Sequence, residues 1–132
     1  MTVIESATVV NKPIEQVYTY LADLNNHQQL MPENIYNWTS TADEATFTIQ
    51  NMAKLSIKIA SRVENKELTA VPSEAAPFDI EMKWTVEDNG DGTTTAKHIL
   101  SADLNMMMKM LASGPLQKLV DHQTARLSEI LK

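Results

Sequence analysis

The sequence has 132 residues, of which 43% are hydrophobic and 21% are charged, and its formal net charge is −6. This length and composition are typical of a globular chain with a hydrophobic core, so we expect one domain over residues 1–132. The acidic balance, with Arg62 and Arg126 as the only arginines, argues against a nucleic-acid-binding protein, which needs a basic face.

Cysteine is absent from the sequence, which excludes disulfides, thiolate nucleophiles and cysteine-based zinc sites. No stretch approaches the roughly 20 apolar residues that a membrane-spanning helix needs. The N-terminus lacks the basic start and the long apolar run of a secretion signal. We therefore expect a cytoplasmic protein without a membrane span.

The first thirty residues predict a strand followed by two short helices. Residues 2–10 are rich in Val, Ile and Thr and predict a strand, although apolar side chains at both parities leave open which face is buried. Pro13 is tolerated in a first helical turn and begins an amphipathic helix over 13–22. A second short helix is predicted over 24–30, which Pro32 ends because the residue before proline avoids helical geometry.

From residue 33 to 103 the apolar period becomes two, which predicts six strands joined by short turns and hence an antiparallel meander. The predicted strands are 35–40, 45–50, 53–64, 67–71, 78–87 and 93–102. The strand at 53–64 has an apolar face made by Leu55, Ile57, Ile59 and Val63, and a solvated face that carries Lys54, Lys58 and Arg62. The strongest turn signal is 88–92, where Asn-Gly and Asp-Gly supply the positive φ of a tight hairpin.

The C-terminal segment predicts a long, one-sided helix that ends near residue 131. Its apolar residues recur every three or four positions, at Leu116, Leu119, Val120, Leu127, Ile130 and Leu131. Gln123 interrupts this stripe, and Thr124 falls elsewhere on the helix. Pro115 cannot donate to the carbonyl of Leu111, so the helix is expected to kink or restart there.

Methionine is unusually frequent just before Pro115, at Met106, Met107, Met108 and Met110. An unbranched thioether side chain repacks easily around other shapes. Two interpretations remain open: these residues form a flap over one end of a cavity, or they fill irregular gaps in the core.

The opening Pro13-Ile14-Glu15-Gln16-Val17-Tyr18-Thr19-Tyr20-Leu21-Ala22-Asp23, after a strand and before Pro32, resembles the START-related helix-grip superfamily. The segment 114–121 resembles many of its bacterial members. The superfamily includes the major birch-pollen allergen, lipid-transfer domains and polyketide cyclases, and the resemblance covers essentially the whole chain. It implies an α+β helix-grip fold, in which a curved antiparallel sheet of about seven strands wraps around the long C-terminal helix. Its members share a pocket rather than catalytic residues, so it implies little about function.

In this arrangement a cavity would lie between the sheet and the C-terminal helix. Mostly apolar walls with a few polar groups are typical of small-molecule sites. The predicted ligand-binding residues are Leu55, Ile57, Ile59, Met82, Trp84, His98, Leu100, Met107, Met108, Leu111, Leu116, Val120 and Gln123. Tyr18, Tyr20, Tyr36 and Trp38 are further candidates for the pocket or its portal. The alternative is that these side chains pack a solid core.

His98 is the most informative single residue because it lies at an inward position among apolar neighbours. It is either a candidate general acid or base, since histidine titrates near neutral pH, or a structural histidine. Gln123 faces the same region. Its amide either orients a bound ligand or is simply a polar side chain at the more hydrated end of a cavity. We expect no metal, because His27, His98 and His122 have no recognisable ligand spacing, and no cofactor.

Two functions of different classes follow. The first is binding or transport of a small hydrophobic or amphipathic molecule, lipid-like or polyketide-like. The second is an enzyme similar to polyketide cyclases or dehydrases, with His98 as general acid or base and Gln123 or Tyr36 holding an oxygen. A protein-interaction module is a third possibility, but it needs an exposed apolar patch, which the outward strand faces lack.

Overall fold

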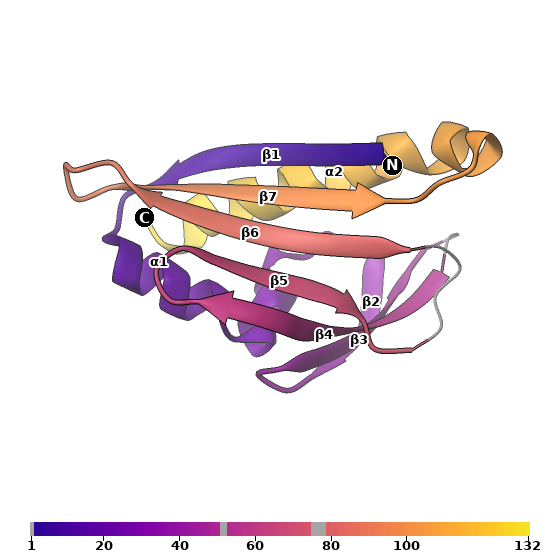
Figure 1. The fold of residues 1–132 in the computed structure, drawn as a ribbon, viewed down its shortest axis with the longest axis horizontal. Coiled ribbons are helices and arrows are strands. Elements are labelled where there is room, and N and C mark those ends of the chain that lie inside the picture. The colour runs from indigo at the N-terminus through magenta and orange to yellow at the C-terminus, as the bar shows by residue number, and fades with distance from the viewer. Residues whose placement is uncertain (1, 51–52, 75–78) are drawn as a thin grey trace.

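A computed structural model describes residues 2–50, 53–74 and 79–132 of the chain, and these form a curved antiparallel sheet with a long C-terminal helix (Figure 1). The strands are β1 (Thr2–Val10), β2 (Ile35–Ser40), β3 (Glu44–Ile49), β4 (Ala53–Val63), β5 (Glu67–Pro72), β6 (Ile80–Asp88) and β7 (Thr94–Ala102). The helices are α1 (Ile14–Leu21), the 3-10 helix η1 (Leu24–Leu30) and α2 (Met106–Ile130). The predicted helix-grip fold is confirmed.

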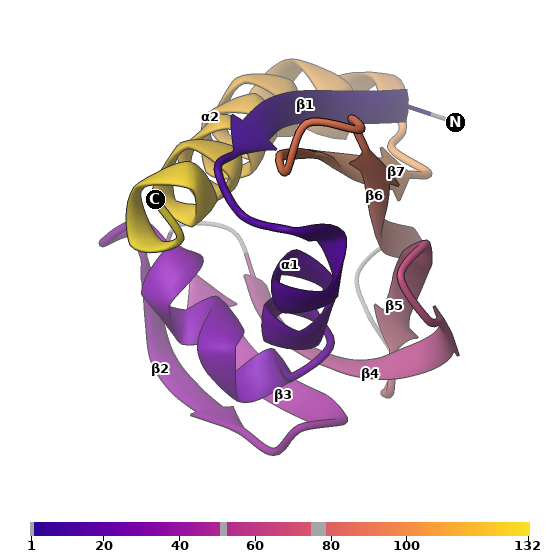
Figure 2. The same cartoon turned by 90° about the vertical axis from the view of Figure 1, so that its left-hand side faces the viewer.

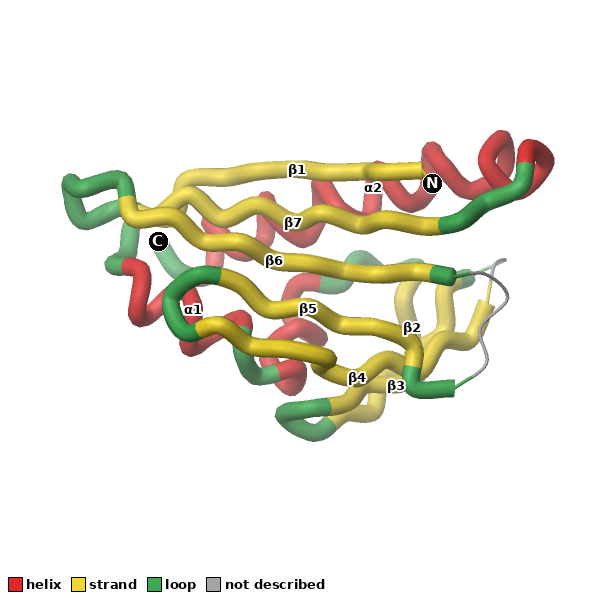
Figure 3. Tube along the Cα trace, viewed as in Figure 1, coloured by secondary structure: helices red, strands yellow, loops and turns green. Residues whose placement is uncertain are grey.

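The sheet has the order β1-β7-β6-β5-β4-β3-β2, so its first strand pairs with its last. Thr2 lies opposite Ala102 and Val10 opposite Thr94. The sheet curls so that α1 lies within the curve at one end, while α2 runs beside β1 (Figures 2 and 3). The start of α2 lies at the other end of the molecule, away from α1 (Figure 1).

Side-chain alternation sets the concave face as the sequence predicts. In β7 every second residue from Thr94 to Ala102 is buried, and Trp84 and Val86 are buried in β6. The predicted start of β6 at Phe78 lies outside the described residues. The hairpin at 88–94 is confirmed, since Gly90 and Gly92 have φ values of 83° and 87°.

A β-bulge in β4 overturns part of the predicted pattern. Ile59 lies opposite Ala70 and Ser61 opposite Thr69, so Ala60 is an extra residue in this strand. One extra residue exchanges the two faces of a strand beyond it. The inward orientation predicted for Val63 is therefore wrong, because this side chain is exposed.

The same bulge turns Arg62 away from the lysine-bearing face on which it was predicted. Its Nε and Nη2 donate to the carbonyl of Ala22, at 3.1 and 2.8 Å, and Nη2 also donates to the carbonyl of Ala42 at 3.0 Å. Asp43 forms a 2.9 Å ion pair with it. A cation on the carbonyl that follows α1 satisfies a terminal acceptor and complements the helix dipole.

We predict that Arg62→Met lowers the free energy of unfolding by about 1–2 kcal/mol, because the carbonyl of Ala22 loses a charge-assisted donor. Urea denaturation measures the change. Lys58→Met, an equivalent change on the convex face of β4, should alter it by less than about 0.5 kcal/mol. Equal effects of the two substitutions would contradict this role of Arg62.

Helix α2 runs unbroken through Pro115. Of the kink or restart predicted at this residue, the restart is therefore wrong, and the kink stays a prediction. Pro115 and Leu111 both lie on the exposed side of the helix, where water can hydrate the carbonyl that proline leaves without a donor. Thr124, predicted to lie away from the apolar stripe, is buried instead, and its Oγ1 lies 2.8 Å from Oγ of Ser6 in β1. In the described ranges, no helix is long and apolar enough to span a bilayer.

Candidate ligand-binding site

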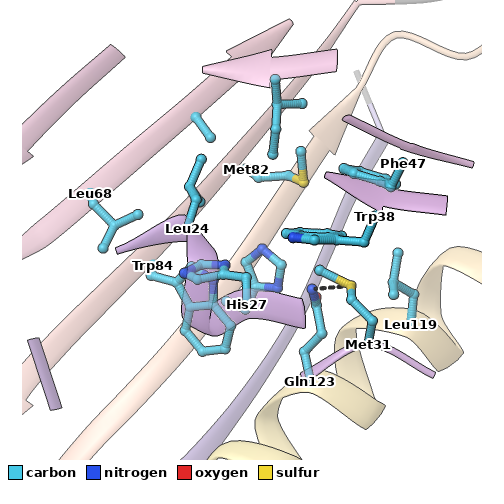
Figure 4. Close-up of a pocket in the computed structure, with 13 residues that line it drawn as sticks. Leu24, His27, Met31, Trp38, Phe47, Leu68, Met82, Trp84, Leu119 and Gln123 are labelled. Carbon is cyan, nitrogen blue, oxygen red and sulfur yellow. Dashed lines mark hydrogen bonds between the residues drawn. The ribbon is translucent and has the colours of Figure 1, made fainter. Parts of the chain in front are cut away.

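An enclosed pocket lies between the concave face of the sheet and the second half of α2 (Figure 4). Its volume is about 20 Å³, which is room for about one water molecule. Its walls are almost entirely apolar or aromatic: Leu24, His27, Met31, Trp38, Phe47, Ile57, Leu68, Ala70, Met82, Trp84, His98, Leu119 and Gln123.

The sheet register brings the two most distinctive side chains of the pocket together. Trp84 and His98 are direct cross-strand partners in β6 and β7, so both face α2. Their rings stack with centroids 4.4 Å apart and planes 3° apart. His27, from η1, meets the same indole edge-on, with centroids 6.3 Å apart and an interplanar angle of 88°.

The two pocket histidines differ in their hydrogen bonding. Nε2 of His27 lies 2.7 Å from the carbonyl of Leu21, and since a carbonyl only accepts, this nitrogen carries the proton. His98 is 1% exposed, and no described residue pairs with either of its ring nitrogens. His27 is thus a satisfied structural histidine, whereas His98 presents two unpaired polar atoms to the pocket.

Gln123 adds a third unpaired atom from the opposite wall. Its side chain is 2% exposed, and its Oε1 has no partner among the residues that the structure describes. Its Nε2 donates only a weak bond to Sδ of Met31, at 3.5 Å (Figure 4). A buried polar atom without a partner costs about 1–3 kcal/mol, so these atoms are stabilised by any hydrogen-bonding group that enters the pocket, a water molecule included.

The pKa of His98 is lowered to about 3, chiefly by burial and also by the neighbouring His27. The Gln123 side chain lies close enough to oppose the shift in part, although no well-formed hydrogen bond joins the two side chains. Burial also lowers the pKa of His27, against the hydrogen bond that its ring donates to the Leu21 carbonyl and against the charge of Asp23. At neutral pH His98 is therefore uncharged, with one N–H donor and one acceptor nitrogen.

This shift predicts acid sensitivity of the fold. The pKa of His98 is about 3 in the folded protein and has its ordinary value of 6.5 in the unfolded chain. Between these two pH values the unfolded chain binds a proton at His98 and the folded protein does not. The associated stability is complete above pH 6.5 and is lost as the pH falls towards 3. His98 alone should lower the free energy of unfolding by about 2 kcal/mol between pH 6.5 and 4.5.

His98→Phe keeps an aromatic ring against Trp84 and should remove this part of the pH dependence, as measured by urea denaturation at both pH values. His122→Gln, which removes a histidine of α2 outside the pocket, is the control. An undiminished pH dependence in His98→Phe would contradict the burial argument.

A second hollow, a groove of about 540 Å³, lies nearer the start of α2. It is lined by Asn34, Ile49, Gln50, Met108, Leu111, Ala112 and Pro115. On α2 it begins one turn before Leu119 of the pocket, and on β3 it begins two residues after Phe47. Pocket and groove therefore lie end to end along the same helix.

The predicted ligand-binding residues fall into four groups, and their role as ligand contacts stays a prediction. Those that line the enclosed pocket are Ile57, Met82, Trp84, His98 and Gln123. Those that line the groove are Met108 and Leu111. Those packed in the core without lining either hollow are Leu55, Leu100, Leu116 and Val120, with Ile59 partly buried between two core clusters. Met107 is 72% exposed and lines neither hollow.

Of the predicted aromatic candidates, only Trp38 lines the pocket, where it stacks on Phe47 with centroids 5.2 Å apart. Tyr18 is buried in the core, as a staple of α1, and Tyr36 is exposed. The hydroxyl of Tyr20 donates to Oε1 of Gln29 at 2.7 Å, outside both hollows.

Sequence reasoning missed the contribution of η1 to the pocket, which supplies Leu24 and His27, with Met31 directly after it. The spacing of these three residues, three and four positions apart, is a helical signal that marks one face. It also missed Phe47, Leu68 and Ala70, whose burial follows from strand alternation, whereas Leu119 lies on the predicted apolar stripe of the last helix.

The methionine segment is largely outside the core. Met106, Met107, Met110 and Leu111 are 72–82% exposed, whereas Met108 packs on the core cluster and lines the groove. The core-filling interpretation is therefore wrong for three of the four methionines. The flap interpretation stays a prediction.

No protein-family model matches the sequence, and no curated protein matches it. Solved structures, in contrast, match nearly the whole chain. XoxI from Bacillus cereus has a TM-score of 0.79 at 11% identity, covering 99% of this chain and 96% of that chain. A START superfamily protein from Mycobacterium smegmatis has a TM-score of 0.70 at 15% identity, covering 98% and 96%.

A third similar structure is a point mutant of norcoclaurine synthase from Thalictrum flavum in complex with a transition-state analogue. Its TM-score is 0.73 at 10% identity, and the match covers 98% of this chain and 93% of that chain. These likenesses, at low identity, concern the fold alone. The chain has the START-like helix-grip fold, and the resemblance read from its opening motif is confirmed at this level.

Proposed function

We propose that the protein binds a small hydrophobic or amphipathic molecule between the concave sheet and α2. The observation that carries this proposal is the unpaired polar group of His98 and Gln123 inside an otherwise apolar pocket. Buried polar side chains in folded proteins are nearly always hydrogen-bonded. A core that had only to pack would be more stable with apolar side chains of the same shape at both positions.

The dimensions of the two hollows indicate how such a molecule would lie. The enclosed pocket of about 20 Å³ accepts a polar end, whereas the groove of about 540 Å³ accepts an apolar body. Met31 and Met82 form part of the pocket wall, and methionine side chains adjust at low cost to a new neighbour. The pocket wall can thus adjust to a bound group through these side chains.

The START superfamily protein among the similar structures supports a ligand-binding role by likeness of fold. The norcoclaurine synthase complex supports the alternative of an enzyme, by the same kind of likeness. Against His98 as general acid stands its pKa of about 3, which leaves about one ring in 10⁴ protonated at pH 7. A base of this pKa is also weak, since efficient acid–base catalysts titrate near the working pH. We therefore favour a carrier or sensor in the cytoplasm.

Native mass spectrometry of freshly purified protein, followed by titration with the neutral apolar dye N-phenyl-1-naphthylamine, tests the proposal. We expect saturable dye binding and, where the natural ligand is retained, a complex heavier than the polypeptide. Absence of both a retained mass and saturable dye binding would contradict the proposed function. Turnover of a small carbonyl compound that survives His98→Phe would point to an enzyme with other catalytic groups.

Two neighbouring methionines allow a matched test of the groove. Met108→Gln places an amide in its apolar wall and should weaken dye binding by about three- to tenfold, because the amide must be desolvated when the dye binds. Met107→Gln makes the same chemical change on the exposed side of α2 and should leave the dye affinity unchanged. Fluorescence titration of both variants measures this, and equal effects would mean that the groove takes no part in binding.

A further inference from the structure

The polar end of the site has a defined hydrogen-bonding capacity. Neutral His98 offers one N–H donor and one acceptor nitrogen, and Oε1 of Gln123 offers a second acceptor. The amide nitrogen of Gln123 points to Sδ of Met31, which fixes the oxygen as the free atom. A bound group that satisfies this end must therefore both accept one hydrogen bond and donate at least one.

The site also lacks a countercharge. None of the described residues that line the pocket is Asp, Glu, Lys or Arg. A charge without a partner in an apolar cavity is costly, because the protein replaces none of its hydration. An ionised carboxylate is in addition only an acceptor and would leave the oxygen of Gln123 facing another oxygen.

Resting on the proposed function, we propose that the ligand carries an uncharged hydroxyl group, held between His98 and Gln123, and an apolar body that extends along α2 into the groove. The hydroxyl oxygen accepts a hydrogen bond from the His98 N–H, and the hydroxyl group donates a hydrogen bond to Oε1 of Gln123. The geometry thus favours an alcohol or phenol over fatty-acid anions, ammonium amphiphiles and phosphate-bearing lipids.

The size of the apolar body follows from the helix. Gln123 at the polar end and Ala112 in the groove line the two hollows from the same helix. At 1.5 Å rise per residue they are separated by about 16 Å along the axis. A linear chain of about ten carbons, or a fused-ring skeleton of the same length, spans most of this distance.

Displacement of N-phenyl-1-naphthylamine by three compounds of equal chain length tests the head group at pH 8. We expect 1-decanol to bind about tenfold more tightly than 2-decanone, which accepts but cannot donate, and more tightly still than decanoate. Decanoate that competes as well as 1-decanol, or equal affinities of 1-decanol and 2-decanone, would overturn the hydroxyl assignment while the proposed function stands. Failure of the dye and all three compounds to bind would instead overturn the proposed function.

Gln123→Met preserves side-chain volume and removes the acceptor, so the ratio of 2-decanone to 1-decanol dissociation constants should fall from about ten to about one. Gln117→Met, at a glutamine of α2 that lies outside the pocket, should keep the wild-type ratio. His98→Phe removes the N–H donor that both compounds use, so both affinities should fall while the ratio stays at about ten. Thermal melting confirms that each variant is folded, and an unchanged ratio in folded Gln123→Met overturns the assignment.

Discussion

The pairing of β1 with β7 is the constraint on which the rest of the structure depends. These strands lie near opposite ends of the chain, yet they form an unbroken antiparallel ladder from Thr2–Ala102 to Val10–Thr94. Closing such a long loop costs conformational entropy, which burial along the seam offsets. The ladder gives α2 the strand on which it packs, and the Ser6–Thr124 hydrogen bond joins the two elements directly. The first strand thus holds in place the last helix, which supplies Leu119 and Gln123 to the pocket.

The same seam explains where the polarity of the pocket lies. Across the concave face, Leu68, Trp84, His98 and Ser6 follow one another as cross-strand partners from β5 to β1. The row is apolar up to Trp84 and polar from His98 onward, where it meets Gln123 and Thr124 of α2. Ser6 and Thr124 satisfy each other, whereas His98 and Gln123 have no partner in the described chain. The difference separates a structural polar contact from a candidate binding one.

Periodicity was sufficient to predict the fold where each strand has two unlike faces. In β6 and β7 the alternation and the Asn-Gly hairpin placed Trp84 and His98 on the concave side. It failed at the bulge around Ala60, because no glycine or proline marks that position. It also failed at Thr124, whose burial depends on Ser6, a residue 118 positions away. Long-range partners of this kind leave no local signal in a sequence.

The volume of the site was also beyond prediction, since it depends on side-chain conformations rather than on the pattern of apolar residues. The two ends of the molecule differ in how firmly their helices are held by the rest of the fold. At one end α1 lies within the curve of the sheet (Figure 2), and Arg62 holds the carbonyl that follows this helix. At the other end, the first turns of α2 are mostly exposed. The helix begins there with an N-cap, in which the Met108 N–H donates to Oδ1 of Asn105 at 2.9 Å.

Pro115 lies between the mostly exposed first turns of α2 and the part of the helix that packs in the core. It removes one backbone hydrogen bond between the exposed methionine turns and the part of α2 that buries large side chains, from Leu116 onward. Segments with few buried contacts open at lower free energy than the core. Widening the groove therefore costs least on the side of Met108 and Leu111, while Gln123 stays fixed by the packing of Val120 and Leu127 on either side. The helix thus combines a rigidly held polar side chain, Gln123, with a groove wall at Met108 and Leu111 that can move.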